Sequence, residues 1–171
     1  MKINNIVAAC LLMGTASWCA ADPVTINITG NVVASPCVVS TGSVSQTVDL
    51  GLGQPIQAST LQTAGAITNW ANFTVNLTSC PAGTTTAIMT MHGSADATNP
   101  NDMYHSTGTA QNISVELQSQ VGDLLGDGKS LSGTIASNAY AYQLRARAYT
   151  QNGSVTPGSI VATVTASFVY N

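Results

Sequence analysis

The chain has 171 residues, of which 44% are hydrophobic and only 6% are charged, with a formal net charge of −3. No cluster of Lys or Arg is present, so nucleic acid is not expected as a partner. The length suits a single domain with a substantial core, and the abundance of Thr, Ser, Asn and Gly is typical of short strands and turns.

Residues 1–21 are predicted to be a secretory signal peptide. Lys2 supplies the positive charge, residues 6–13 are mostly apolar, and small residues precede a cleavage site that we place after Ala21, to within one residue. Lipid attachment through Cys19 is disfavoured because the bulky Trp18 precedes it. No other apolar run reaches the about 20 residues that a membrane-spanning helix needs. The mature chain then carries three cations against seven carboxylates, a net charge of −4.

The mature chain opens with an alternating segment, residues 22–36. Its apolar and polar residues alternate with a period of two, which places the apolar set on one face of an extended strand. The apolar row includes a glycine, which weakens a strand and usually marks the close approach of another group. The pattern predicts a one-sided apolar strand that either begins the chain's own domain or fills a groove elsewhere. Its apolar face consists of Val24, Ile26, Ile28, Gly30 and Val32.

Two cysteines remain after the signal peptide, Cys37 and Cys80, and in an exported chain they predict one disulfide. In the chain-entropy model this bond would stabilise the fold by roughly 4 kcal/mol. It would tie the base of the alternating segment to the body of the protein. No CxxC spacing is present to suggest redox chemistry.

Strand periodicity dominates the remainder of the chain. Turn signals such as Gly126-Asp127-Gly128 and Pro157-Gly158 separate the runs. Residues 56–68 are predicted to be a loop with one helical turn, and residues 93–108 a polar loop. The expected strands are residues 44–52, 73–77, 88–92, 113–118, 131–135, 140–149 and 160–170. This pattern predicts an all-β fold, an antiparallel sandwich of immunoglobulin type.

The first and last predicted strands present the same problem. Each is long, flat and apolar on one face, and an uncovered edge of that kind promotes aggregation. The two strands therefore either pair within one molecule or are used between molecules.

Enzyme chemistry has little support in the sequence. A general acid–base pair or a catalytic triad needs converging titratable groups, and the mature chain has one Glu, two His and no free Cys. His92, Asp96, Asp102 and His105 lie close in sequence, but their spacing matches no zinc pattern, so a solvated loop is expected there. No catalytic residue, metal or cofactor is predicted.

Several features together resemble the subunits of chaperone–usher pili, the type 1 pilin family. The resemblance covers the whole chain and is closest to a minor adaptor pilin of the tip fibrillum, on the stretches 93–96 and 108–118. The matching residues are Gly30 in the alternating segment, Cys37 after it, the run from Phe73 to Cys80, Gly158 fourteenth from the end, and the penultimate Tyr170.

The resemblance implies an immunoglobulin-like β-sandwich that is incomplete because its last strand is missing. A hydrophobic groove would then lie open beside the C-terminal strand. In the family, a periplasmic chaperone fills this groove, and at the outer-membrane usher the extension of the next subunit replaces the chaperone strand. Residues 22–36 would be the donor-strand extension and residues 37–171 the pilin domain. The implied groove and chaperone-contact residues are Gly158, Ile160, Ala162, Val164, Ala166, Phe168 and Tyr170.

The sequence therefore predicts a structural fimbrial subunit that is exported through the periplasm to the cell surface. Its partners would be neighbouring subunits, the chaperone and the usher. A minor tip adaptor is the leading hypothesis, and the major rod subunit is the alternative. A ligand-binding adhesin is less favoured because about 150 residues leave no room for a separate lectin domain. A self-contained secreted sandwich that binds a small ligand is the weakest alternative.

Overall fold

The computed structural model describes residues 25–171, which fall into two units. Residues 32–171 form one unit, and residues 25–31 belong to the other and are described by themselves. The predicted signal peptide, its cleavage site and Val24 lie outside the described residues. Within residues 25–171, no helix combines the length and the apolar character needed to cross a bilayer.

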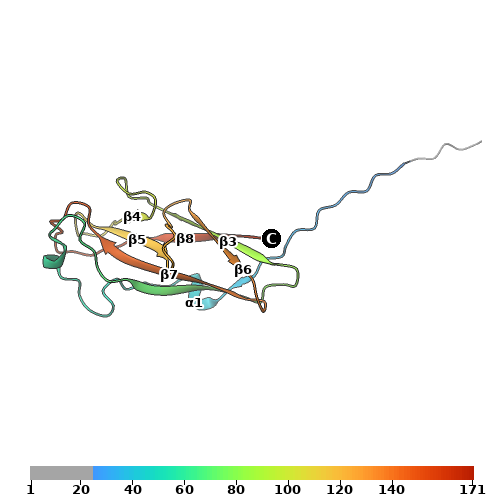
Figure 1. Cartoon of the computed structure of the whole chain (residues 1–171), viewed down its shortest axis with the longest axis horizontal. Coiled ribbons are helices and arrows are strands. Elements are labelled where there is room, and N and C mark those ends of the chain that lie inside the picture. The colour runs from blue at the N-terminus through green and yellow to red at the C-terminus, as the bar shows by residue number, and fades with distance from the viewer. Residues whose placement is uncertain (1–24) are drawn as a thin grey trace, which may run out of the picture. The chain divides into compact units, whose positions relative to one another are not determined.

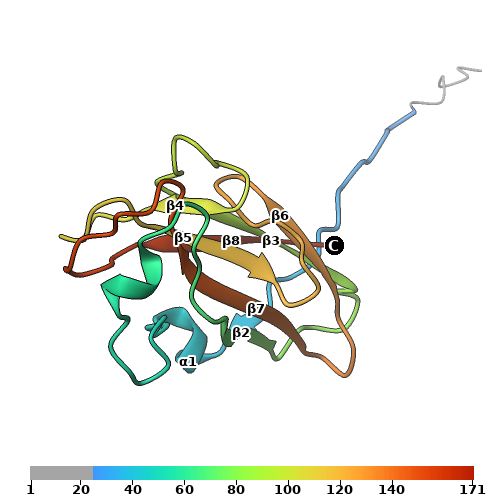
Figure 2. The same cartoon turned by 60° about the vertical axis from the view of Figure 1, so that its left-hand side comes forward.

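Eight strands form two antiparallel sheets in the larger unit (Figures 1 and 2). The five-stranded sheet has the order β1 (Val38–Val39), β2 (Ala71–Thr78), β7 (Tyr140–Tyr149), β5 (Ser114–Ser119) and β4 (Met103–His105). The three-stranded sheet has the order β6 (Ser130–Thr134), β3 (Thr86–Gly93) and β8 (Val164–Tyr170). Two short helical segments, α1 (Thr41–Val44) and the 3-10 turn η1 (Ala58–Leu61), lie between β1 and β2. The predicted all-β sandwich is confirmed.

Strand β7 shows how the alternation of the sequence produces the two layers. Tyr142, Leu144, Ala146 and Ala148 are buried, whereas the residues between them lie on the outer face. The strand pairs with β2 on one side and with β5 on the other, so its backbone groups are satisfied along both edges. A strand of this pattern can bury one face completely, and β7 therefore occupies the centre of its sheet.

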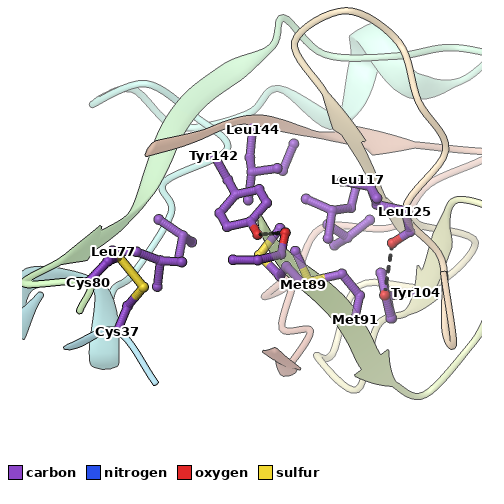
Figure 3. Close-up of a cluster of buried hydrophobic side chains, with 14 residues drawn as sticks. Cys37, Leu77, Cys80, Met89, Met91, Tyr104, Leu117, Leu125, Tyr142 and Leu144 are labelled. Carbon is purple, nitrogen blue, oxygen red and sulfur yellow. Dashed lines mark hydrogen bonds between the residues drawn. A yellow bond between two sulfur atoms is a disulfide. The ribbon is translucent and has the colours of Figure 1, made fainter. Parts of the chain in front are cut away.

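The core fills the space between the sheets, and two buried tyrosines cross it (Figure 3). The Tyr142 hydroxyl donates a hydrogen bond of 2.7 Å to the Ala87 carbonyl oxygen on β3. The Tyr104 hydroxyl donates one of 2.9 Å to the Leu125 carbonyl oxygen. Burial raises the pKa of both hydroxyls above the ordinary tyrosine value, which further favours the protonated form that donates these bonds.

The expected disulfide joins Cys37 to Cys80, just before β1 and just after β2, with an S–S distance of 2.06 Å. The C-terminus lies at the same end of the unit (Figure 1). There the Thr85 N–H donates a hydrogen bond of 2.7 Å to the Asn171 carbonyl oxygen. The Thr84 hydroxyl donates a hydrogen bond of 3.0 Å to the carbonyl oxygen of Ser35. Ser35 therefore lies beside the C-terminal end of β8.

The prediction of a strand over residues 44–52 is wrong. Helix α1 ends at Val44, and a turn follows in which the Asp49 carboxylate accepts hydrogen bonds from the N–H groups of Gly51 (2.8 Å) and Gly53 (2.7 Å). Side chains that bond to nearby backbone groups compete with strand pairing, and here the turn is the more stable arrangement. Leu52 adopts a positive φ of 54° in this turn.

Two further boundaries differ from the sequence prediction. The polar loop predicted over residues 93–108 contains β4, which pairs with β5. The last strand begins only at Val164, because the backbone of residues 159–161 forms hydrogen bonds with residues 107–110 instead. Residues 107–110 belong to the loop that connects β4 to β5 in the five-stranded sheet. The helical turn predicted within residues 56–68 is confirmed as η1, and the remaining predicted strands occur within two residues of their expected limits.

Candidate functional site: an apolar groove beside the last strand

A groove of about 1240 Å³ opens between β8 and the segment 43–56. Its floor consists of core side chains from the five-stranded sheet, among them Val75, Leu117 and Leu144. Binding sites for small molecules usually enclose about 300–1,000 Å³. The groove is thus larger than most such sites, and its length follows a strand.

Strand β8 forms the first wall of the groove. It pairs with β3 along one edge, and within residues 25–171 no strand pairs with its other edge. Of the seven groove residues predicted from the sequence, six line the groove: Gly158, Ile160, Ala162, Val164, Ala166 and Phe168. Tyr170 does not line it; its ring stacks on Phe168 with a centroid distance of 6.3 Å, and burial raises the pKa of its hydroxyl.

The second wall is the segment 43–56, which the sequence did not reveal as part of a site. Val48 and Leu50 point toward the core from this segment, and the alternation that suggested a strand was the only signal of it. Few bonds attach the segment to the neighbouring β2. The Asn76 N–H donates to the Ser43 hydroxyl (3.0 Å), and the Gln46 amide donates to the Thr74 carbonyl oxygen (3.2 Å).

The predicted donor residues within the described part of the chain are exposed. Val24 lies outside the described residues, and Ile26, Ile28 and Val32 are largely exposed. A Cβ built on Gly30 would meet no atom within 4 Å. Residues 25–31 carry neither helix nor strand. Their insertion into a groove therefore remains a prediction.

A polar cluster on the outer face of the five-stranded sheet was missed at the sequence level. Glu116 is only 4% exposed and forms an ion pair of 2.5 Å with Arg147. The guanidinium carbons of Arg145 and Arg147 lie 4.3 and 4.1 Å from the ring centroid of Trp70. Gln118 accepts a hydrogen bond of 2.9 Å from Arg145 and donates one of 2.7 Å to Glu116. Glu116 and Arg147 neutralise each other, and among the described residues the one buried side-chain nitrogen or oxygen without a hydrogen-bond partner is Arg145 Nε, so the cluster has the pattern of a structural network.

Three of the residues considered as metal ligands form hydrogen bonds with different side chains. His92 bonds to Ser167, Asp96 to Ser114 and Asp102 to Gln118, while His105 is exposed. Within residues 25–171, no group of three or more His, Cys, Asp or Glu side chains is placed to hold a metal ion.

Comparison with known proteins agrees with this architecture. The family model for the fimbrial protein matches residues 26–171. Protein FimG of Escherichia coli K12 is 39% identical over 99% of this chain and 98% of its own length. The S-fimbrial adhesin protein SfaS of Escherichia coli O6:K15:H31 is 32% identical over 99% of both chains. The crystal structure of the P pilus rod subunit PapA superposes with a TM-score of 0.68 at 17% identity, covering 80% of this chain and all of PapA.

The chain belongs to the fimbrial protein family. It is a structural pilus subunit and not an enzyme, in agreement with the sequence prediction.

Proposed function

We propose that this subunit joins its neighbours by strand donation. In this proposal the groove beside β8 accepts the extension of one neighbour, and Val24, Ile26, Ile28, Gly30 and Val32 fill the groove of another. The observation that carries the proposal is the unpaired edge of β8 above an apolar groove, in a chain whose N-terminal extension has one apolar face. Strand addition at such an edge satisfies the main-chain groups and buries the alternate side chains.

The dimensions of the two parts agree. The predicted donor face spans nine residues, about 30 Å, and the wall from Gly158 to Phe168 spans eleven, at most about 36 Å, at a rise of about 3.3 Å per residue. Burying each aliphatic donor side chain contributes about 1.5–3 kcal/mol, so several kcal/mol are available before the cost of ordering the strand. Gly30 would place bare backbone at one point of the groove.

Export and assembly follow from the same feature. An unfilled groove exposes a continuous apolar surface, which favours aggregation unless a partner covers it. We infer that a periplasmic chaperone supplies this cover by contacts along residues 158–170. The outer-membrane usher would be the place where the next subunit's extension replaces the chaperone, and the finished fimbrium would lie at the cell surface. Residues 1–21 would direct the chain across the inner membrane.

Within the pilus, we assign the chain to a minor adaptor position at the tip. This assignment is supported by the adaptor-like stretches 93–96 and 108–118 and by the 39% identity to FimG. Subunit stoichiometry in purified pili tests it, since an adaptor is present in one or a few copies per fibre. A chain that makes up most of the fibre would instead be the rod subunit.

The strand-donation proposal is tested by the double substitution Ile26→Asp and Ile28→Asp in the mature chain. Two carboxylates on the apolar face cannot enter the groove without a large desolvation cost, so this donor-defective variant should no longer fill a neighbour's groove. It should still bind a synthetic peptide of residues 22–36, because its own groove is intact. The matched control, Thr25→Asp and Asn27→Asp, places the same charges on the opposite face. Normal polymerisation of the donor-defective variant would overturn the proposal.

A second candidate function is direct binding of a receptor by the pilin domain. It is favoured by SfaS, which is named an adhesin and matches this chain over 99% of its own length without requiring a further domain. Pili assembled with and without this chain, compared for adhesion with the tip adhesin inactivated, would separate the candidates. Adhesion that persists only when this chain is present would support the receptor-binding role.

A further inference from the structure

The first part of the β8 wall of the groove, residues 158–163, does not belong to β8. The strand begins at Val164, opposite Gly93 of β3, and within residues 25–171 the six residues before it pair with no strand. They are nevertheless extended, because partly buried and exposed side chains alternate along residues 160–164. Gly158, Ile160 and Ala162 line the groove together with the strand. Contacts other than sheet pairing therefore hold this part of the wall in place.

The loop between β4 and β5 provides these contacts through residues 106–110. The Thr107 N–H donates a hydrogen bond of 2.8 Å to the Val161 carbonyl oxygen, and the Ala110 N–H donates one of 3.0 Å to the Ser159 carbonyl oxygen. A Cβ on Gly158 would lie 2.3 Å from the Ala110 nitrogen, so the two segments approach this closely only with glycine at that position. These two bonds satisfy carbonyl groups of the wall and leave its N–H groups to other acceptors.

Hydroxyl groups accept the hydrogen bonds from those N–H groups. The Ser159 N–H donates to Thr109 Oγ1 (2.9 Å), and the Thr109 N–H donates in return to Ser159 Oγ (3.1 Å). The Val161 N–H donates to Ser106 Oγ (3.2 Å), and Ser106 is only 7% exposed. We call Ser106, Thr109 and Ser159 the hydroxyl clamp. Its side chains take the place of a neighbouring strand for a segment that no sheet supports.

The clamp occupies one edge of the segment and leaves the other edge free. Asn171 exchanges two hydrogen bonds with Thr86 of β3, at 2.9 and 3.0 Å. Because bonded and non-bonded pairs alternate in an antiparallel ladder, the odd-numbered residues of β8 bond to β3, and the even-numbered ones present their backbone groups to the opposite edge. Ser159 and Val161 continue the odd-numbered set along the clamp. The even-numbered residues of the wall therefore face the groove with both their side chains and their backbone groups.

We infer that the hydroxyl clamp positions Ile160 and Ala162 to pair with the incoming strand. Among the described residues, no group bonds to the N–H or C=O of either residue, so both are available. The inference rests on the proposed strand donation and specifies its partner. The strand-accepting edge then runs along residues 158–168 instead of 164–168, and it fits an extension of a neighbouring subunit whose alternation continues over that length. A shorter alternating strand would leave the clamped residues unpaired.

The experiment measures amide hydrogen exchange by NMR in the donor-defective variant of the full mature chain. The synthetic peptide of residues 22–36 is the probe, and it represents the alternating extension of whichever subunit donates. The clamp variant adds Thr109→Val and Ser159→Ala, two exposed positions whose replacement leaves the core intact. The matched control, Thr90→Val and Ser130→Ala, removes a hydroxyl pair (2.8 Å) that bridges β3 and β6 outside the groove.

With the clamp intact, the peptide should slow exchange at Ile160 and Ala162 as well as at Val164 and Ala166. In the clamp variant the slowing at the first two amides should fall at least about tenfold, while the β8 amides keep theirs, and the peptide should bind about tenfold more weakly. The control pair should change neither quantity. Thr109→Ser alone, which keeps the hydroxyl, should leave the slowing at all four amides unchanged.

A second variant, Ser106→Ala, removes the acceptor for the Val161 N–H and should reduce the slowing at the neighbouring Ala162 in the same way. Full slowing at Ile160 and Ala162 in both variants would overturn the inference and leave strand donation intact. An equal loss at every edge amide would also overturn it, because the hydroxyls would then support the fold in general. If the peptide slows none of these amides while the clamp is intact, strand donation itself is wrong.

Discussion

The hydroxyl of Tyr142 on β7 bonds to the carbonyl oxygen of Ala87 on β3 at 2.7 Å, which links the two sheets through the centre of the core. Both residues are fully buried, and Ala87 belongs to the strand that supports β8. The groove wall is therefore held in position by an internal polar contact as well as by apolar packing.

Replacing Tyr142 by Phe should destabilise the subunit. The change leaves a buried carbonyl oxygen without its side-chain donor, which costs about 1–3 kcal/mol. Denaturant unfolding of the peptide-filled subunit measures the loss as a lower midpoint at unchanged slope. Tyr149→Phe is the control, because that hydroxyl bonds only to the exposed Gln151 side chain at 3.2 Å. Equal midpoints for the Tyr142 and Tyr149 variants would show that the core bond contributes nothing.

Gly108→Ala should both destabilise the subunit and weaken peptide binding. A Cβ at Gly108 would lie 2.0 Å from the Ser159 carbonyl oxygen, so the crossing of residues 107–110 with residues 159–161 would have to move. Backbone shifts of this kind cost about 1–3 kcal/mol, and here they would displace the Gly158 end of the groove.

Gly42→Ala is the matched control for this substitution. Its Cβ would meet no atom within 4 Å, and the residue lies in helix α1, where Ala is favoured over Gly. This variant should be as stable as the parent or slightly more so, with unchanged peptide binding. A Gly108 variant that behaves in the same way would contradict the steric account.

Removal of the disulfide should lower the free energy of unfolding by about 4 kcal/mol in the chain-entropy model, since the bond closes a loop with a sequence separation of 43. The double substitution of Cys37 and Cys80 by Ser tests this in equilibrium unfolding. Parallel measurements on the parent protein with and without reductant provide the control. A loss below about 1 kcal/mol would mean that the unfolded chain is already compact around this loop.

Stability should fall in acid partly through Asp96. Partial burial alone would raise the pKa of this carboxyl, but hydrogen bonds from Ser114, Thr98 and Asn99 together lower it from its usual 3.8 to about 2. A lowered folded-state pKa stabilises the protein above the unfolded value, and the contribution disappears as the pH falls from about 4 toward 2.

The Asp96 prediction is checked by unfolding midpoints measured over this pH range. Ser114→Ala removes one donor to the carboxylate (2.6 Å) and should make the acid dependence shallower. Thr107→Ala, at an exposed hydroxyl that does not bond to Asp96, should leave it unchanged. If the slopes of the Ser114 variant and the parent coincide, Asp96 does not contribute.

The sequence predicted a strand best where that strand pairs with a neighbour along both edges and buries one face in the core. The alternation around Tyr142 and Leu144 predicted β7 correctly, because hydrophobic periodicity reports directly on which face is covered. The same reasoning failed for residues 44–52, whose alternation is real but whose backbone follows the Asp49 turn. Hydrophobic periodicity shows which side chains are apolar. It does not show whether another strand is available to pair with the backbone of that segment.

The candidate site was predictable only in part for a related reason. The wall formed by residues 158–168 was expected from the resemblance to pilins, and its residues follow one another in sequence. The opposite wall and the floor come from distant segments that meet only in three dimensions. The stacking of Trp70 with two arginines depends on the register Asn72 to Arg145 between β2 and β7, which no local pattern specifies.

The position of the disulfide has a mechanical consequence. If subunits are linked by the proposed strand donation and the fibre is stretched, tension enters residues 37–171 where the proposed extension ends, at Cys37. Strand β1 forms only two residue pairs with β2 and could peel away under load. The covalent bond to Cys80 carries the tension past this weak ladder into the end of the eight-residue strand β2. A reduced fibre should therefore lengthen at lower force than an oxidised one.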